Sequence, residues 1–359
     1  MHPITIIGTG LAGYAVAREL RKIDKDSPLK LITNDDGNFY SKPMLSNAFA
    51  KNKSAEALIT TPVAKMAEQL NAEILTHTQV TDIESLNYSK LVLALGAKPI
   101  PLSDKIISVN DLIDYANFRT ALKDAKTVAI IGAGLIGCEF ANDLQQYGNF
   151  QVSLIDPISH PLGNLVPPEV GQCLKTALEN IGVKFYLEQA IKHIDSGYKL
   201  TLTDNTELEA DVVLSAIGLR PRIDLAANLA VKQGIVVDKY LKTSADNIYA
   251  LGDCAEVEGI FLPYVMPLMN SARALAKTLT GQTTAVKYPA MPVVVKTPAY
   301  PIVVASPAAG IKGKWNIEAD KENIKALFYT EQQQLMGFVL TGTKVAEKAA
   351  LAKQVPFLL

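Results

Sequence analysis

The chain has 359 residues, a length that predicts two or three domains. Apolar residues make up 48% and charged residues 20%, as in an ordinary globular protein. The formal net charge of −1 excludes the basic footprint of a nucleic-acid binder. No apolar run reaches the roughly 18 residues of a membrane span, and residues 1–17 lack the basic start of a signal peptide. Three cysteines are too few for a disulfide framework, so we expect a cytoplasmic protein.

The charge is unevenly distributed along the chain. Residues 1–99 carry 11 basic and 10 acidic side chains, residues 100–261 carry 13 and 21, and residues 262–359 carry 11 and 5. The middle is therefore acidic and the C-terminal part is basic. The basic part is either an ordinary solvated surface or a docking patch for an acidic partner.

The first predicted unit is an apolar strand that runs into a glycine-rich turn. Residues 4–13 read Ile-Thr-Ile-Ile-Gly-Thr-Gly-Leu-Ala-Gly, with G-x-G-x-x-G spacing. A helical pattern over 14–22 and an apolar strand over 29–33 follow. This order predicts a βαβ unit that opens a doubly wound parallel sheet. The turn residues predicted to bind a dinucleotide are Gly8, Thr9, Gly10, Leu11, Ala12 and Gly13.

The same pattern returns 124 positions later. Residues 128–137 read Val-Ala-Ile-Ile-Gly-Ala-Gly-Leu-Ile-Gly, followed by a helical pattern over 138–147 and a strand over 151–155. One such motif is also typical of a plain tight turn, but two copies in this context indicate two dinucleotide sites. The glycines permit the turn, a close approach to pyrophosphate, and helix–strand packing. The second set of predicted contacts is Gly132, Gly134 and Gly137.

Acidic residues distinguish the two predicted sites. Asp156 lies at the end of the second unit's strand, where a carboxylate binds ribose hydroxyls and repels a 2′-phosphate. No arginine follows between residues 157 and 168, so we expect NADH rather than NADPH. The alternative is an aspartate that only caps a turn. In the first unit we expect Asp35 to bind ribose and Thr33 and Asn34 to line the adenosine.

Later strands end in glycine and add candidate contacts. One apolar run covers residues 90–95, another covers 211–217, and a third short strand precedes a Gly-Asp pair. Each reads either as a simple strand and turn or as a further nucleotide contact. The candidates are Ala94, Gly96, Gly218, Gly252 and Asp253.

Together these features resemble the FAD-dependent pyridine nucleotide–disulfide oxidoreductase superfamily over nearly the whole chain. The resemblance implies FAD at the first unit and NAD(P)H at the second. It also implies that Asp253 binds the flavin ribitol, that the backbone of Val80 contacts adenine, and that Glu139 lies near nicotinamide and flavin. Val265 would begin the helix whose N-terminus faces the flavin.

The expected fold is α/β, with two doubly wound Rossmann-like domains of the glutathione-reductase type and a small C-terminal α+β domain. The expected boundaries are 1–108 and 234–290 for the FAD domain, 109–233 for the NAD domain and 291–359 for the C-terminal domain. In the last we expect strands at 293–295, 302–305, 315–318, 324–329 and 335–340, and a closing helix at 343–353.

The cysteines exclude an internal disulfide relay. Disulfide reductases of this superfamily carry a redox cysteine pair after the first unit, but no cysteine lies between Thr33 and Pro62. We interpret Cys138, Cys173 and Cys254 as structural residues. Electrons must then pass from the flavin directly to an external acceptor, and we expect no metal site.

One segment points to the class of acceptor. Residues 39–46, Phe-Tyr-Ser-Lys-Pro-Met-Leu-Ser, resemble the Y-x-[RK]-P-x-L-S element of reductases that feed small iron–sulfur proteins. Many members have a lysine after the final serine, where this chain has Asn47. With the Val-Lys-Thr-Pro run at 295–298, the segment most resembles the bacterial, rubredoxin-reducing branch. Lys42 and Lys296 are either surface lysines or flavin-facing ammonium groups that stabilise reduced flavin.

The expected activity is electron transfer from NADH through FAD to rubredoxin, a small acidic carrier, one electron per acceptor. The expected catalytic residues are Lys42, Glu139 and Lys296. By resemblance, reduced rubredoxin could supply an alkane hydroxylase. Alternatives are a flavorubredoxin or ferredoxin reductase, an NADH-sensing flavoprotein that acts by interaction, and a non-flavin protein with two nicotinamide sites.

Overall fold

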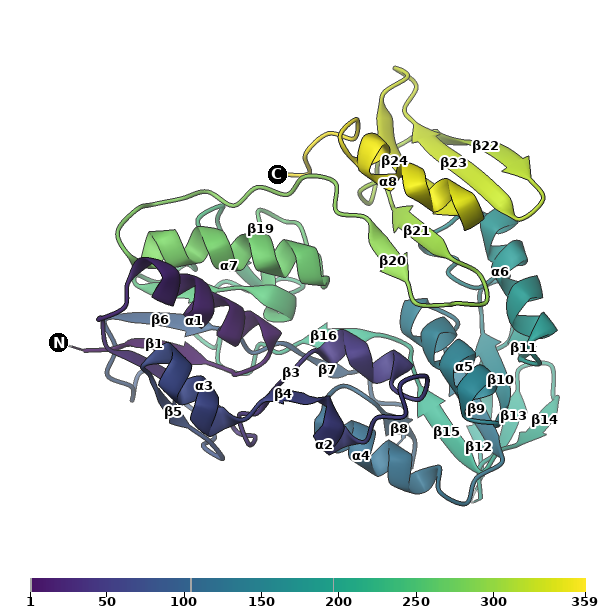
Figure 1. Cartoon of the computed structure of the whole chain (residues 1–359), viewed down its shortest axis with the longest axis horizontal. Helices are drawn as coiled ribbons and strands as arrows, with labels where there is room; N and C mark the ends of the chain where they lie inside the picture. Colours follow the sequence, from purple (N-terminus) through teal and green to yellow (C-terminus); the bar gives the residue numbers. More distant parts are fainter. Residues whose placement is uncertain (1, 104, 196) are drawn as a thin grey trace.

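The computed structural model describes residues 2–103, 105–195 and 197–359. It has three lobes, each built around its own sheet (Figure 1). The first lobe carries the N-terminus, the second lies in the middle of the sequence, and the C-terminal lobe follows residue 292. No helix within these described ranges has the length and apolar character needed to cross a membrane.

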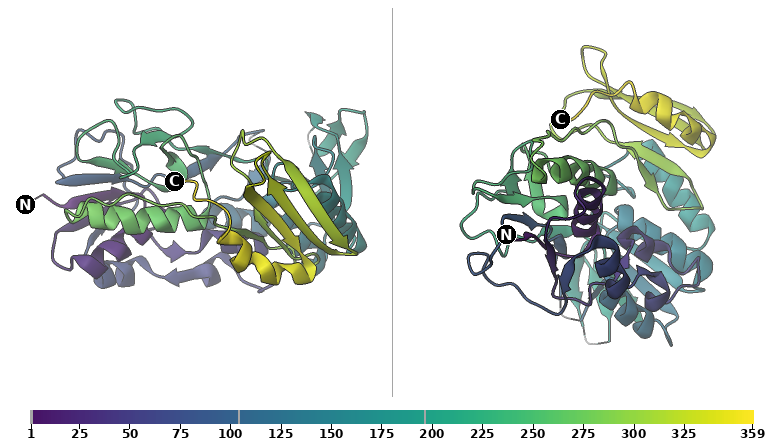
Figure 2. Two further views of the ribbon diagram at one scale, coloured as in Figure 1. Left: turned by 90° about the horizontal axis from the view of Figure 1, so that it is seen from above. Right: turned by 60° about the vertical axis from the view of Figure 1, so that its left-hand side comes forward.

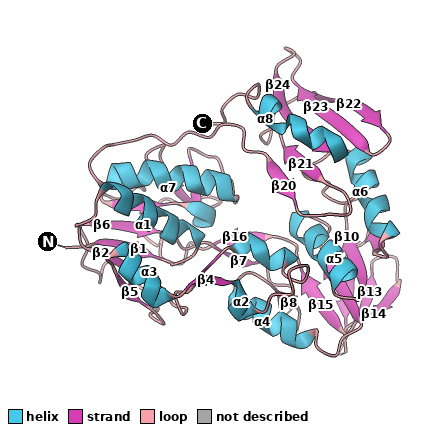
Figure 3. Ribbon diagram, viewed as in Figure 1, coloured by secondary structure: helices cyan, strands magenta, loops and turns pink. Residues whose placement is uncertain are grey.

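A parallel five-stranded sheet forms the first lobe, in the order β18-β6-β1-β2-β5. Its strands are β1 (Ile4–Ile7), β2 (Leu29–Ile32), β5 (Glu73–Leu75), β6 (Lys90–Leu93) and β18 (Ile248–Ala250). Because β18 comes so late in the chain, the polypeptide leaves this sheet and returns to it. Helices α1 (Leu11–Ile23) and α7 (Val265–Leu279) pack against each other over the sheet, and α3 (Val63–Leu70) lies beside α1 (Figure 3).

A second parallel sheet, in the order β11-β10-β9-β15-β8, forms the second lobe. Its strands are β8 (Ile107–Ser108), β9 (Thr127–Ile131), β10 (Gln151–Asp156), β11 (Lys184–Leu187) and β15 (Val212–Ser215). Its helices are α4 (Leu112–Ala121), α5 (Leu135–Tyr147) and α6 (Pro168–Asn180). A small antiparallel sheet completes it, with β12 (Ile191–Ile194), β13 (Lys199–Leu202) and β14 (Glu207–Glu209). Both βαβ units expected from the glycine motifs are therefore present.

Short elements join these two lobes. The antiparallel pair β7 (Ala97–Pro99) and β16 (Leu219–Pro221) carries the chain across in both directions. The other short elements are β3 (Phe39–Tyr40), β4 (Ile59–Thr61), α2 (Ala55–Leu58), β17 (Ile235–Val237), β19 (Ala255–Val257) and the 3₁₀ helices η1 (Lys42–Asn47) and η2 (Gly252–Cys254). Of these, η1 packs against α5 of the second lobe.

The C-terminal lobe is an antiparallel sheet in the order β20-β21-β24-β23-β22. Its strands are β20 (Val293–Val295), β21 (Ile302–Ala305), β22 (Lys314–Asp320), β23 (Asn323–Tyr329) and β24 (Leu335–Thr341), as the sequence predicts apart from the ends. Burial alternates along β23, the pattern of a strand with one face in a core. Its sheet lies to one side of α1 and α7 in both views of Figure 2, while the chain end at Leu358 and Leu359 packs against the core of the first lobe.

The closing helix predicted over 343–353 is only partly an α-helix. The chain makes a 3₁₀ helix, η3 (Gly342–Glu347), and then only a short α-helix, α8 (Lys348–Ala352). Gly342 has φ of +53°, and Thr343 donates its N–H to the side chain of Asn323, so the segment begins tied to the β22–β23 turn. Leu351 of α8 then packs with Phe338 on one face of the sheet.

Candidate active site

Most of the first-lobe candidates lie at one edge of its sheet. Because the strands are parallel, the segments after β1, β2, β6 and β18 emerge together at their carboxyl ends. These segments contain the glycine turn, Thr33 to Asp35, Ala94 to Gly96, and the Gly252–Asp253 pair. Val80 is buried in the core of the same lobe, and Val265 begins α7.

The two glycine turns have the same geometry. Gly8 and Gly132 have φ near +106° and +105°, a conformation that side chains rarely adopt. A Cβ on Gly13 would collide with the carbonyl oxygen of Gly8, and one on Gly137 would collide with that of Gly132. By contrast, nothing lies within 4 Å of a Cβ built on Gly10 or Gly134. Each turn therefore packs tightly against its own lobe at the first and third glycines. The backbone of its middle glycine stays accessible, as a bound pyrophosphate requires.

Asp35 is already engaged within the first lobe. Its Oδ1 accepts hydrogen bonds from the Thr33 hydroxyl at 2.6 Å and the Gly37 N–H at 2.9 Å, with the Thr9 hydroxyl at 3.3 Å. These bonds hold the carboxylate beside the glycine turn. Asn34 is exposed next to it.

Asp156 has the capping role that the sequence analysis gives as the alternative to ribose binding. Its Oδ2 accepts the Ala133 N–H at 2.6 Å and its Oδ1 accepts the Ile158 N–H at 2.8 Å. The side chain is buried at the end of β10, against the second glycine turn. Gly218, with φ of +114°, follows β15 at the same edge. The structure thus places Asp156 where a ribose contact is expected, with one N–H already bound to each oxygen.

Glu139 and Lys296 meet directly. The Glu139 side chain is 1% exposed, and its carboxylate contacts the Lys296 ammonium. Its Oε2 also accepts the Ser46 hydroxyl at 2.6 Å, and its Oε1 accepts the Lys296 backbone N–H at 3.0 Å. The Lys296 ammonium donates further to the Pro43 carbonyl and the Ser46 hydroxyl, both at 2.8 Å. Residues of η1 and of the C-terminal lobe therefore converge on one buried carboxylate of the second lobe.

Glu139 is one of three polar residues on a single face of α5. Asn142 and Asp143 follow at helical spacing and are almost as buried. Asn142 Oδ1 accepts the Ala299 N–H at 3.1 Å, so it binds the β20–β21 loop. The Asp143 oxygens accept the Phe49 and Ala50 N–H groups, both at 2.9 Å, just beyond η1. This face of α5 holds the other two lobes in place.

Lys42 lies apart from that ion pair, at the other end of η1. Its ammonium donates to Asn110 Oδ1 at 2.6 Å, while Asn110 Nδ2 donates to the Ala97 carbonyl at 3.1 Å. Burial lowers the pKa of Lys42, and the negative charge of Asp253 opposes this shift. Burial likewise raises the pKa of Asp253. Lys42 and Asp253 therefore lie near enough for the charge of each to influence the pKa of the other.

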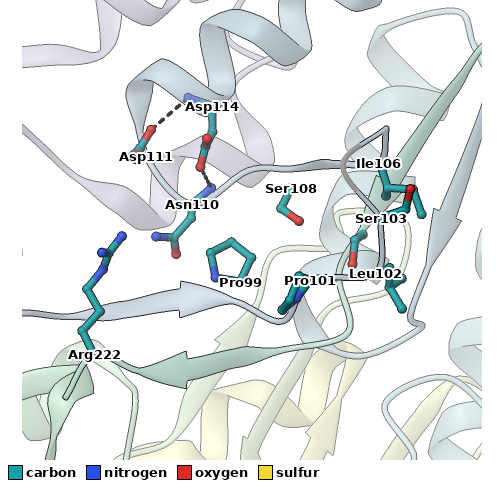
Figure 4. Close-up of a pocket in the computed structure, with 11 residues that line it drawn as sticks. Pro99, Pro101, Leu102, Ser103, Ile106, Ser108, Asn110, Asp111, Asp114 and Arg222 are labelled. Atoms are coloured by element: carbon teal, nitrogen blue, oxygen red, sulfur yellow. Dashed lines mark hydrogen bonds between the residues drawn. The ribbon is translucent and has the colours of Figure 1, made fainter. Parts of the chain in front are cut away.

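A cavity of about 300 Å³ opens beyond Asn110, between the first two lobes (Figure 4). Arg222, Asp111 and Asp114 line it, and Asp114 Oδ2 accepts the Asn110 N–H at 2.9 Å. The cavity therefore borders the residue that holds Lys42.

The cysteines carry no sign of a redox centre. All three are free, and Cys138 and Cys254 are buried. Burial raises the pKa of the Cys254 thiol to about 11 and raises that of Cys138 further. Thiols held in the protonated form are poor nucleophiles, which agrees with a structural role.

Comparisons with known proteins agree with this geometry. Residues 2–278 match the family described as pyridine nucleotide-disulphide oxidoreductase. The chain belongs to this family. Residues 285–355 match a second family, described as the rubredoxin binding C-terminal domain.

Two curated relatives match almost the whole chain. The rubredoxin-NAD(+) reductase of Alcanivorax borkumensis is 50% identical, with 99% of each chain covered. The nitric oxide reductase FlRd-NAD(+) reductase of Aliivibrio fischeri is 39% identical, with 98% of each covered. Among solved structures, a ferredoxin reductase from Rhodopseudomonas palustris has the same fold, with a TM-score of 0.87 at 24% identity over 97% of this chain and 93% of that one. The fold expected from the sequence is confirmed.

Sequence reasoning missed three residues that this member of the oxidoreductase family uses to build the site. Ser46 lies inside the motif at residues 39–46, but the motif alone does not show that its hydroxyl binds Glu139. Asp143 ends the run Leu-Ile-Gly-Cys-Glu-Phe-Ala-Asn-Asp, which also carries the resemblance, but the run does not show its partners, which lie 93 and 94 residues away, and Asn110, whose partner lies 68 residues away, belongs to no motif. Only the folded chain brings these pairs together.

Two of the three glycines of the first turn, Gly13 and Gly10, give a matched test of these interpretations. We expect Gly13→Ala to lower the free energy of unfolding by about 1–3 kcal/mol, because its Cβ collides with backbone. Gly10→Ala should leave the stability of the FAD-free protein unchanged but weaken FAD binding, because its methyl points into open space. Thermal unfolding and a fluorescence titration with FAD measure the two effects. Equal loss of stability in both variants would contradict this division.

Proposed function

We propose that this chain is a cytoplasmic flavoprotein reductase that passes electrons from NADH through FAD to rubredoxin, one electron per acceptor. The single observation that carries the proposal is the Glu139–Lys296 contact, because it joins the lobe that matches a rubredoxin-binding family to the second glycine turn and its helix α5. The greater identity to a rubredoxin-NAD(+) reductase than to a flavorubredoxin reductase supports rubredoxin as the acceptor.

The proposal divides the chain by role. Residues 1–108 and 234–290 would hold FAD, residues 109–233 NADH, and residues 291–359 the acceptor. FAD when bound supplies the capacity to take a hydride and to release electrons singly. Open backbone at Gly10 and the positive end of α1 suit its pyrophosphate, and Asp35, Val80 and Asp253 are its proposed contacts.

The charged side chains have separate parts in this proposal. Lys42, oriented by Asn110, presents a positive charge beside Asp253 in a buried environment where charge interactions are strong. Lys296 neutralises Glu139 and is itself held by the Pro43 carbonyl and Ser46. Both ammonium groups are held by hydrogen bonds to protein groups, and preorganised charges of this kind stabilise negative charge that develops during a reaction.

The surface of the C-terminal lobe suits an acidic acceptor. Five of its lysines are exposed and form no ion pair within the described residues: Lys312, Lys314, Lys321, Lys348 and Lys353. They support the docking interpretation of the basic C-terminal part. Electron-transfer complexes are weak and small, so long-range charge attraction contributes much of their association rate. Supply of an alkane hydroxylase by the reduced rubredoxin remains part of the proposal, by resemblance alone.

One test of the proposed function concerns Lys42. We expect Lys42→Met to slow flavin reduction by NADH roughly 100-fold. Since burial lowers the pKa of Lys42, the wild-type rate should fall as the pH rises through a value below the ordinary lysine pKa of about 10.4. Lys42→Arg stays charged and should move this alkaline limb to higher pH. Stopped-flow pH profiles test this, and an unmoved limb in the arginine variant would assign the titration to another group.

Another prediction distinguishes the two interpretations of Asp156, ribose binding and turn capping. Asp156→Asn keeps a carbonyl acceptor for a capping N–H but removes the charge that repels a 2′-phosphate. We expect the preference for NADH over NADPH to fall by roughly tenfold or more, since a like-charge contact costs several kcal/mol. Measurements of kcat/KM with both nucleotides test this. An unchanged ratio would leave Asp156 with the capping role only.

A further prediction concerns how turnover with the acceptor depends on salt. Turnover with rubredoxin should fall at least about threefold as added salt shortens the Debye length from about 10 Å at 0.1 M to about 3 Å at 1 M. A neutral quinone serves as the control acceptor and should be much less affected. Relative turnover with rubredoxin, flavorubredoxin and ferredoxin ranks the acceptors. Slow turnover with all three would instead favour the NADH-sensing alternative.

A further inference from the structure

A second carboxylate lies beside Asp156 in the second lobe. Asp156 gives one oxygen to the Ala133 N–H and the other to the Ile158 N–H, so both of its oxygens are engaged within the protein. The loop that follows it, residues 157–168, contains no lysine or arginine that could bind a 2′-phosphate. The next strand of the sheet, β11, leads directly into Glu188. Two adjacent strand ends at this edge of the sheet therefore carry an acidic residue.

Glu188 lies next to Asp156 because β10 and β11 are parallel neighbours. Their register pairs Asp156 with Leu187, so Glu188 is the first residue beyond β11 at the same carboxyl edge. The Glu188 N–H donates to the Ile158 carbonyl at 3.3 Å, and the Gln189 N–H donates to the Asp156 carbonyl at 3.1 Å. These two bonds join the turn after β11 to the loop after β10. The backbone of Glu188 is thus one hydrogen bond away from the loop where the adenosine ribose is expected.

The backbone of Glu188 is held in an uncommon conformation. Its φ is +57°, in the left-handed region that favours glycine or asparagine. Such a conformation persists where the surrounding structure fixes it. On the far side of the turn, Gln189 Oε1 accepts the Thr203 hydroxyl at 2.7 Å and the Asp204 N–H at 3.0 Å. The turn is therefore fixed between two loops, and a glutamate occupies a position that favours glycine.

The Glu188 carboxylate is not neutralised by a neighbouring cation. The residue is exposed, and within the described part of the chain no lysine, arginine or histidine pairs with it. By contrast, Glu179 and Glu207 of the same lobe each pair with a lysine. Adjacent strands lie about 5 Å apart, and the Debye length at 0.1 M salt is about 10 Å. The charge of Glu188 is therefore felt by an anion bound at the end of β10.

We infer that Glu188 helps to select NADH over NADPH, because its carboxylate repels a 2′-phosphate on an adenosine ribose bound at Asp156. The inference rests on the NADH site of the proposed function, and it does not depend on the acceptor. The selectivity then comes from two carboxylates at adjacent strand ends and from a loop without lysine or arginine. Exclusion of the wrong ligand by a repulsive group is a general route to specificity. Glu188 is thus a specificity-determining residue that acts through its charge.

The test compares the binding of ADP-ribose with that of its 2′-phosphate, by calorimetric titration of the full chain loaded with FAD. Neither ligand has a nicotinamide, so the result does not depend on hydride transfer. We expect Glu188→Gln to bind the 2′-phosphate at least about threefold more tightly, with unchanged affinity for ADP-ribose. Glu188→Lys should raise the gain to about tenfold or more, because it supplies a cation. Both gains should shrink in 1 M salt, where the Debye length is about 3 Å.

Glu169→Gln is the matched control, because it removes the same charge from an exposed residue at the start of α6 in the same lobe. It should match the wild type with both ligands. Three outcomes would overturn the inference: wild-type selectivity in Glu188→Gln, an equal gain in Glu169→Gln, or a gain that salt does not reduce. A wild-type protein that binds neither ligand would instead refute the donor site of the proposed function, and the inference with it.

Discussion

A buried carboxylate determines how the three lobes are joined. Glu139 lies in the interior of the molecule, where a charge is stable only with an opposite charge and several hydrogen-bond donors. Its own helix provides none of them as side chains. They come from Ser46 in η1, the short helix that packs against α5, and from Lys296 in the C-terminal lobe. The desolvation cost of one side chain is thus offset only when the three lobes meet in one arrangement.

The same helix face extends this constraint to the backbone. Asn142 and Asp143, one turn on from Glu139, accept N–H groups of the β20–β21 loop and of the segment after η1. Loops usually lie on the surface because their backbone groups need partners. Here α5 provides those partners, so these irregular segments can pack against the second lobe. This allows η1 and Lys296 to lie next to the glycine turn that begins α5.

Sequence patterns predicted the local units well, because their causes are local. The strands before Gly8 and Gly132 and the tight turns that follow depend on residues within one βαβ unit, and both formed as expected. The closing helix predicted over 343–353 is confirmed only over 348–352, because the segment that begins at Gly342, where Thr343 binds Asn323, is a 3₁₀ helix. The hydrogen bond between Asn110 and Lys42 could not be predicted, because the two residues are 68 positions apart and meet only in the folded chain. The carboxylate of Asp156 was placed correctly at its strand end, but its capping bonds were visible only in the folded chain.

The missing cysteine pair and the composition of the C-terminal lobe are connected. A reductase with an internal disulfide can pass electrons to a resident thiol, whereas the three cysteines of this chain are free, two of them buried and the third in helix α6. An external acceptor must then approach the flavin. A reductase surface with a charge opposite to that of the acceptor favours this approach. The exposed lysines of the C-terminal lobe suit that requirement, while Lys296 of the same lobe lies inside the site. One small sheet therefore contributes positive charge in two ways: outward, for association with a mobile partner, and inward, for the charge balance of the buried site.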